Sequence, residues 1–154
     1  MQNINVADKI ISEDLEQIFC STEKIWKELK GKQIFLTGAT GFFGIWLLES
    51  FIRANKMLNL DAKAVVLTRN PKSFQEYLPH ISSDSAIRFH VGDVRDFVYP
   101  EENFSHIIHG ATTSANETFN KQDPLIKYDT VAGGTRHTLD FAVKCNCEKF
   151  LLIS

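Results

Sequence analysis

The chain has 154 residues, of which 44% are apolar, and a formal net charge of −2, which suits one globular domain with its own core. The balanced charge gives no electrostatic argument for binding nucleic acid or an anionic membrane. No apolar run approaches the roughly 20 residues that span a bilayer, and the first residues do not form a secretory signal. We therefore expect neither a nucleic-acid partner nor a membrane partner.

The three cysteines are an odd number, and only Cys145 and Cys147 are close in sequence. This pattern favours free thiols in a reducing compartment, so we expect a cytoplasmic protein. A Cys-x-Cys pair without further Cys or His at ligand spacing does not predict a metal site, and we expect none.

Residues 1–31 are predicted to form a helical extension made of two short helices. Ser12 can cap the first helix, and Ser21 or Thr22 can cap the second, which Gly31 would end. Such an extension either packs on the rest of the domain or contacts an oligomer partner, and we favour packing.

A glycine-spaced turn follows the first predicted strand. Gln33–Thr37 is apolar without alternation, as in a buried parallel strand, and a helix starts near Phe42. Gly38 permits a tight turn, Gly41 lets a ligand approach the backbone, and Gly44 lets the helix pack closely. The unpaired N–H groups and the positive dipole end of that helix suit a pyrophosphate. The alternative is a tight turn without a ligand.

The segment Thr37-Gly38-Ala39-Thr40-Gly41-Phe42-Phe43-Gly44 resembles the Thr-Gly-x-x-Gly-x-x-Gly fingerprint of the extended short-chain dehydrogenase/reductase family, which includes NAD(P)-dependent nucleotide-sugar epimerases and dehydratases. The resemblance covers residues 32–154, and it implies an NAD(P)-binding Rossmann domain. The expected fold is α/β, a doubly wound parallel sheet with strand order 3-2-1-4-5 that is truncated after the fifth strand. In this turn the expected cofactor-binding residues are Gly38, Thr40, Gly41, Phe42, Phe43 and Gly44.

The second predicted strand, Ala62–Thr68, ends at the residues that determine whether NAD or NADP is preferred. NAD-binding members of the family carry a carboxylate there, whereas this chain has Thr68-Arg69-Asn70. The guanidinium of Arg69 suits a 2′-phosphate, so we favour NADP over NAD. The alternative is that Arg69 is a solvated loop charge.

The next helix can begin at two places. Asn70 followed by proline predicts one start, and the capping box from Ser73 to Glu76 offers a later one. The helix should end by Pro79. Ile87–Val91 then reads as the third strand.

The segment Gly92-Asp93-Val94-Arg95-Asp96 follows the third strand and resembles a Gly-Asp-hydrophobic-Arg-Asp segment of the family. The resemblance implies that Asp93 accepts a hydrogen bond from the adenine amino group and that Val94 packs on the ring. The alternative is an ordinary turn rich in aspartate.

The fourth strand, His106–His109, leads into a segment that resembles the His-x-Ala-Ala motif of the family. Small residues here would let the cofactor ribose approach the backbone. Gly110, Ala111 and Thr112 are therefore expected to line the cofactor site. We interpret His109 as a packed residue at the strand end rather than an acid or base.

The longest predicted helix is Pro124–Lys144, and the fifth strand is Phe150–Ile153. Gly133 and Gly134 lie inside this helix at a cost of roughly 1 kcal/mol each, so a close neighbour is expected. Val131 stands where family members often carry Asn. The resemblance also implies that residues 113–122 border the substrate.

No catalytic residue is assigned. The family's Tyr-x-x-x-Lys follows the fifth strand, and Tyr77, Tyr99 and Tyr128 have no Lys four residues later. Ser154 lies just before the expected catalytic hydroxyl. We expect the chain to be inactive alone, and its apolar last strand makes a homo-oligomer a reasonable hypothesis.

Three functions remain open at this point. The leading one is the nicotinamide-dinucleotide-binding part of an NAD(P)-dependent nucleotide-sugar epimerase or dehydratase, whose partner is a small-molecule substrate. The alternatives are a carbonyl or hydroxysteroid-type reductase of the same fold, and a non-catalytic NADP-sensing regulatory protein.

Overall fold

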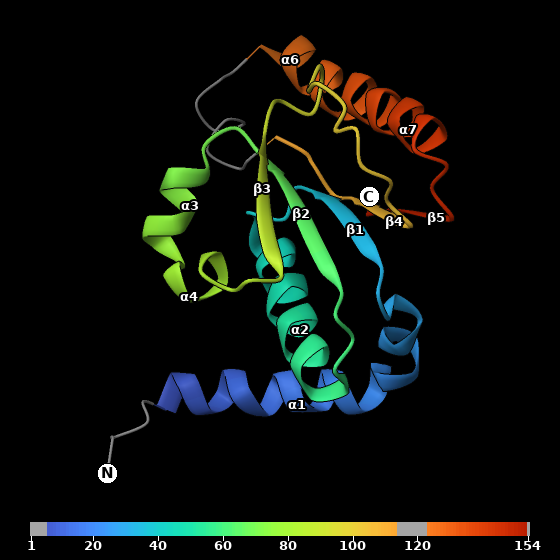
Figure 1. Ribbon diagram of the computed structural model, residues 1–154. Helices are drawn as coiled ribbons and strands as arrows, with labels where there is room; N and C mark the ends of the chain where they lie inside the picture. Colours follow the sequence, from blue (N-terminus) through green and yellow to red (C-terminus); the bar gives the residue numbers. More distant parts are fainter. Residues whose placement is uncertain (1–5, 114–122, 154) are drawn as a thin grey trace.

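The computed structural model describes residues 6–113 and 123–153, with side chains from residue 12 onward, and its strands form a parallel sheet (Figure 1). The order is β3-β2-β1-β4-β5, which confirms the predicted α/β class and strand order. The strands are β1 (Gln33–Thr37), β2 (Lys63–Thr68), β3 (Ile87–Val91), β4 (His106–His109) and β5 (Lys149–Leu152). The predicted bounds agree for β1, β3 and β4. Strand β2 begins one residue later than predicted and ends as predicted, and β5 lies one residue earlier at both ends.

The central strand β1 is buried on both faces of the sheet. It pairs with β2 on one side and β4 on the other, and Ile34, Phe35 and Leu36 are each at most 1% exposed. Successive side chains point to opposite faces. Ile34 and Leu36 therefore join one core cluster, whereas Phe35 packs in a second one.

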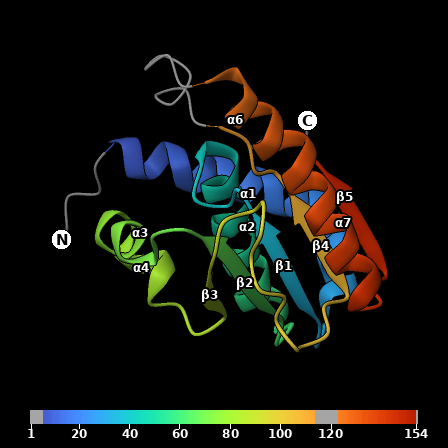
Figure 2. The same cartoon turned by 90° about the horizontal axis from the view of Figure 1, so that it is seen from above.

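Helices cover the two faces of the sheet. The Ile34 face packs against α2 (Phe42–Leu58), α3 (Pro71–Tyr77) and α4 (Pro79–Ser82), and the Phe35 face packs against α7 (Gly134–Lys144). The short helix α6 (Pro124–Tyr128) and a π-helical turn, η2 (Asp129–Gly133), precede α7. Figure 2 shows α6 and α7 alongside β4 and β5, and α3 and α4 toward β3.

The N-terminal extension differs from its prediction. One helix, α1 (Val6–Trp26), replaces the two expected helices, and a 3₁₀ turn, η1 (Lys27–Leu29), follows it. Ser21 and Thr22 do not cap a second helix, because their hydroxyls donate to carbonyls four residues earlier in the same helix. The helix packs against α2, where Trp26 meets Phe51 edge to face at 6.4 Å.

Two further expectations about helices are corrected. Asn70 caps α3, since its side-chain oxygen accepts from the Ser73 N–H, so the capping box from Ser73 to Glu76 is not used. The predicted helix Pro124–Lys144 is interrupted by η2, a wide turn of a kind often found at functional sites. Within the described ranges, no helix combines the length and apolar character needed to cross a bilayer.

Candidate functional site

A cavity of about 430 Å³ lies at the carboxyl ends of the strands. Segments following β1, β2, β3 and β4 line it, and α3, α6 and η2 close its sides. Strand order reverses between β1 and β4, which is where open parallel sheets bind ligands. The volume is within the range of small-molecule sites.

The glycine turn after β1 brings two predicted motifs into contact. Gly38 has a φ of +73°, and a Cβ there would lie 2.3 Å from the Gly110 carbonyl oxygen. A Cβ on Gly44 would lie 2.2 Å from the Ala39 Cα, so this glycine allows α2 to pack on the turn. Both close approaches agree with the roles expected for the first and third glycines.

The start of α2 fits an anionic group. No side chain among the described residues caps this helix, and its N-cap is Gly41. The Gly41 N–H donates to the Gly38 carbonyl at 3.1 Å, which fixes the turn. First-turn N–H groups without a side-chain cap, together with the helix dipole, suit the pyrophosphate of a dinucleotide.

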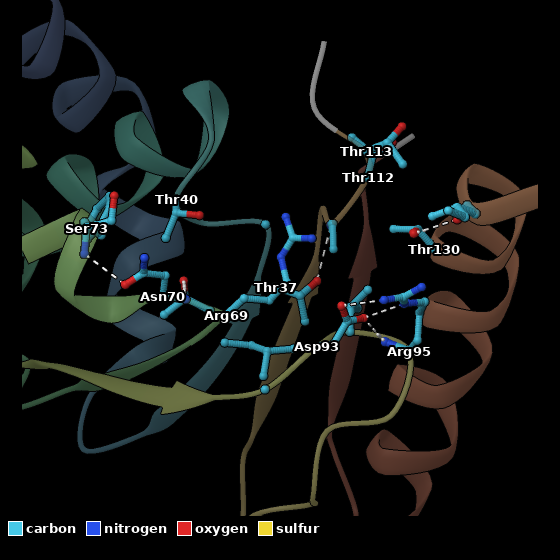
Figure 3. A pocket seen from close by; sticks show the side chains of 18 of the residues that line it. Thr37, Thr40, Arg69, Asn70, Ser73, Asp93, Arg95, Thr112, Thr113 and Thr130 are labelled. Carbon is cyan, nitrogen blue, oxygen red and sulfur yellow. Dashed lines mark hydrogen bonds and ion pairs between the residues drawn. The ribbon is translucent and has the colours of Figure 1, made fainter. Parts of the chain in front are cut away.

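The cavity gathers only part of the predicted site. Its lining includes the predicted residues Gly38, Thr40, Arg69, Asp93, Val94, Ala111 and Thr112 (Figure 3). Gly41, Phe42, Phe43, Gly44 and Gly110 are not in its lining. Phe42 and Phe43 are 73% and 72% exposed, and their rings meet edge to face at 5.6 Å.

A buried hydrogen-bonded chain behind the cavity was not foreseen. Thr37 Oγ1 lies 2.7 Å from His109 Nδ1, and His109 Nε2 lies 3.0 Å from Thr135 Oγ1. The Ala111 N–H also donates to Thr37 Oγ1 at 3.3 Å. Burial lowers the pKa of His109, which is 1% exposed, and a neutral imidazole provides one donor and one acceptor for the two hydroxyls. His109 is thus a packed residue, as expected, and it ties β1, β4 and α7 together.

The loop after β3 carries an ion pair within the cavity lining. Arg95 Nε and Nη2 donate to the two carboxylate oxygens of Asp93 at 2.8 and 2.9 Å. Hydrogen bonding to the Arg95 guanidinium holds the pKa of Asp93 below its ordinary value. Val94 is 9% exposed and packs against α7, where a Cβ on Gly134 would lie 2.8 Å from its Cγ1. That contact is the close neighbour expected for Gly134.

Other lining residues were missed by sequence reasoning. Ser73 and Tyr77 reach the cavity from α3, and Ile126 and Thr130 reach it from α6 and η2. Their proximity depends on how helices pack beside the sheet, and no local motif marks them. Thr37 could have been found, because it begins the glycine fingerprint.

A parallel sheet of this order, with a glycine turn and a cavity where strand order reverses, defines the Rossmann class of nucleotide-binding folds. Within this class, the chain belongs to the NAD dependent epimerase/dehydratase family, whose sequence profile matches residues 34–154. This match confirms the resemblance to the extended short-chain dehydrogenase/reductases, and it implies a nicotinamide cofactor.

Two curated relatives agree with this family assignment. The chain is 29% identical over 127 residues to the UDP-glucose 4-epimerase of Vibrio cholerae, covering 80% of this chain and 34% of that protein. It is 25% identical over 129 residues to the UDP-glucose 4-epimerase of Rickettsia prowazekii, covering 80% of this chain and 36% of that protein. The chain therefore spans about a third of the length of these curated relatives.

Solved structures share the fold at lower identity. The epimerase Mth375 of Methanothermobacter thermautotrophicus has a TM-score of 0.65 at 20% identity, covering 87% of this chain and 38% of that one. DesIV, the dTDP-glucose 4,6-dehydratase of Streptomyces venezuelae solved with NAD and TYD bound, has a TM-score of 0.60 at 22% identity, covering 77% of this chain and 38% of that one.

Proposed function

We propose that this chain is the cofactor-binding part of an NADP(H)-dependent enzyme that epimerises or dehydrates a nucleotide sugar. The observation that carries the proposal is the close approach of the Gly38 and Gly110 backbones, which leaves no room for a side chain at Gly38. The turn lies beside the start of α2, where no side chain of the described residues caps the helix. The twelve predicted site residues are part of this proposal. The turn would hold the pyrophosphate, and the loops after β2 and β3 would hold the adenosine half.

The choice of NADP rests on the end of β2. Arg69, Asn70 and Ser73 all line the cavity there, and the segment from Thr68 to Asn70 contains no carboxylate. A guanidinium can hold a phosphate by two charge-assisted hydrogen bonds, whereas a carboxylate at this position would repel it.

The nucleotide-sugar substrate is proposed from the relatives, which are UDP-glucose 4-epimerases. The same-fold reductase and the non-catalytic NADP sensor remain alternatives, but no contact in the described residues favours either one. A cytoplasmic location and self-association through β5 are likewise proposals. Three free cysteines support the first, and the exposed Leu151 and Leu152 at the sheet edge support the second.

A titration of NADPH and NADH, followed by calorimetry and tryptophan fluorescence, tests the proposal. We expect both to bind, with NADPH the tighter ligand. Arg69→Ala should weaken NADPH binding about tenfold or more and leave NADH binding nearly unchanged, because only NADPH carries the 2′-phosphate. Lys72→Ala is the matched control, since Lys72 is an exposed cation on α3 outside the cavity lining.

Two results would contradict these proposals separately. If neither nucleotide binds, the proposed cofactor site is wrong. If Arg69→Ala weakens NADPH and NADH equally, the cofactor site remains but the assignment of the phosphate to Arg69 is lost.

A further inference from the structure

The loop between β3 and β4 follows one side of α7. Four residues of the helix, spaced three or four apart, share that side: Gly134, His137, Phe141 and Lys144. Val94 of the loop packs on the first of them. Phe97 meets the ring of the second edge to face, with centroids 4.8 Å apart. Tyr99 meets the ring of the third at 5.1 Å and the ammonium group of the fourth at 5.2 Å. The loop is therefore held to the helix at successive turns.

His137 supplies the polar part of this contact. Its Nε2 lies 2.9 Å from the Phe97 carbonyl oxygen, which can only accept, so Nε2 carries the hydrogen and donates it. The Tyr99 hydroxyl donates to the His137 carbonyl at 3.0 Å and lies 3.2 Å from Nδ1. Burial, together with the charge of Asp140, raises the pKa of Tyr99, so this hydroxyl keeps the hydrogen that it donates. We call the contact of Phe97 and Tyr99 with His137 the clasp.

The clasp lies outside the cavity, but the loop that it holds forms part of the cavity wall. The three residues of the clasp are not in the lining, whereas Asp93, Val94 and Arg95 are. The Phe97 N–H donates to the Asp93 carbonyl at 2.8 Å, so the turn that carries the lining residues closes directly onto the clasp. A shift of Phe97 would therefore move this turn and the cavity wall with it.

We propose that His137 is a positioning residue that holds residues 92–99 against α7, so that this wall of the cavity is already formed in the free protein. This role deepens the proposed function and rests on it, because the ligand concerned is the dinucleotide that would bind in the cavity. His137 need not touch that ligand. Its effect arises because a loop that is already ordered costs no binding free energy to order.

Hydrogen exchange of the loop amides, measured by NMR with and without NADPH, tests the proposal. In the wild type, the Asp96 and Phe97 N–H groups, which both donate to the Asp93 carbonyl, should exchange equally slowly in the free and bound protein. His137→Phe keeps a ring but cannot donate to the Phe97 carbonyl. In the free variant these two amides should exchange about tenfold faster, and NADPH should slow them again. NADPH binding should weaken about fivefold, because the loop then orders only on binding.

Three further variants make the comparison specific. His137→Gln is the conservative replacement, because its amide nitrogen can donate to the Phe97 carbonyl, and it should exchange and bind within about twofold of the wild type. Tyr99→Phe keeps the ring and removes the hydroxyl, so it should speed the same amides by a smaller factor, and it replaces His137→Phe if that variant does not fold. Arg136→Gln is the matched control on α7, since the Arg136 side chain is 83% exposed, and it should behave as the wild type.

The amides of β1 report global opening and should exchange at the same rate in every variant. Loop amides as slow in free His137→Phe as in the wild type overturn the proposal, and so does acceleration of the β1 amides by the same factor. A His137→Gln variant that behaves as His137→Phe overturns it as well. If NADPH does not bind the wild type, the proposed function fails. The free proteins then decide the role of the clasp, because faster exchange confined to the loop supports it and unchanged exchange overturns it.

Discussion

The side chain missing at Gly38 is what allows the turn after β1 to lie against the loop after β4. The backbone there is left-handed, and the Gly110 carbonyl occupies the space a Cβ would need. Gly31 has nearly the same conformation, with a φ of +67°, but no atom of the described residues lies within 4 Å of its Cβ position. A side chain at Gly31 would therefore meet only the strain of a left-handed backbone, whereas one at Gly38 would meet that strain and a steric clash as well.

Gly38→Ala should lower the free energy of unfolding by roughly 2–4 kcal/mol, because it adds a clash with backbone to the cost of a left-handed residue. Gly31→Ala should cost only about 1 kcal/mol, since it adds strain alone. Urea unfolding of both variants gives the comparison. Equal losses would mean that the contact with Gly110 is easily relieved, contrary to the proposed geometry.

At the scale of single elements, the paired glycines of the 124–144 helix have different neighbours. Gly133 is exposed at the end of η2, with no described atom within 4 Å of its Cβ position, whereas Gly134 begins α7 against Val94. The predicted close neighbour is thus present at one glycine and absent, among the described residues, at the other.

Gly133→Ala should raise the free energy of unfolding by up to about 1 kcal/mol, because alanine favours the helix and meets no obstacle. Gly134→Ala should lose this gain and weaken NADPH binding, because its methyl group displaces Val94 from the cavity wall. Thermal unfolding and the NADPH titration measure the two effects. A Gly134→Ala variant as stable and as tightly binding as Gly133→Ala would contradict the account.

The elements that the sequence predicted well are those whose signals are local. Gln33–Thr37 is an uninterrupted apolar run, and its strand bounds were correct. The predicted helix break at Ser21 or Thr22 was wrong, because a hydroxyl can cap a helix or bond within it, and sequence does not separate the two. The chain from Thr37 through His109 to Thr135 joins residues far apart in sequence, so only the fold could place them together.

On the scale of the whole molecule, the buried His109 and the half-buried His106 link stability to pH. Burial lowers the pKa of His109, and burial with the nearby charges of Lys32 and Lys149 lowers that of His106. The unfolded chain then binds protons more readily than the folded one between the folded-state pKa and the ordinary value of about 6.5. Stability from these groups is complete above that value and falls as pH decreases through this window.

His109→Gln should therefore flatten the decline of unfolding free energy between about pH 6.5 and pH 5, where the ordinary histidine pKa sets the upper limit. His106→Gln should remove a separate part of the same slope. Asp93, whose pKa is lowered by Arg95, acts at more acidic pH and should not contribute in this window. Urea titrations across the pH range measure the slope, and an unchanged slope in His109→Gln would refute the link.

The wide turn η2 separates α6, which lines the cavity, from α7, which packs in the core. Ile126 of α6 lines the cavity, and Phe141 of α7 is buried in the core on the Phe35 face of the sheet. One residue corresponds to about 100° of rotation around a helix. Deleting a single residue from η2 would rotate α6 relative to α7 and leave Phe141 of α7 packed in the core. Insertions and deletions in η2 can therefore change the side chains that α6 presents to the cavity while the core beside the sheet stays the same.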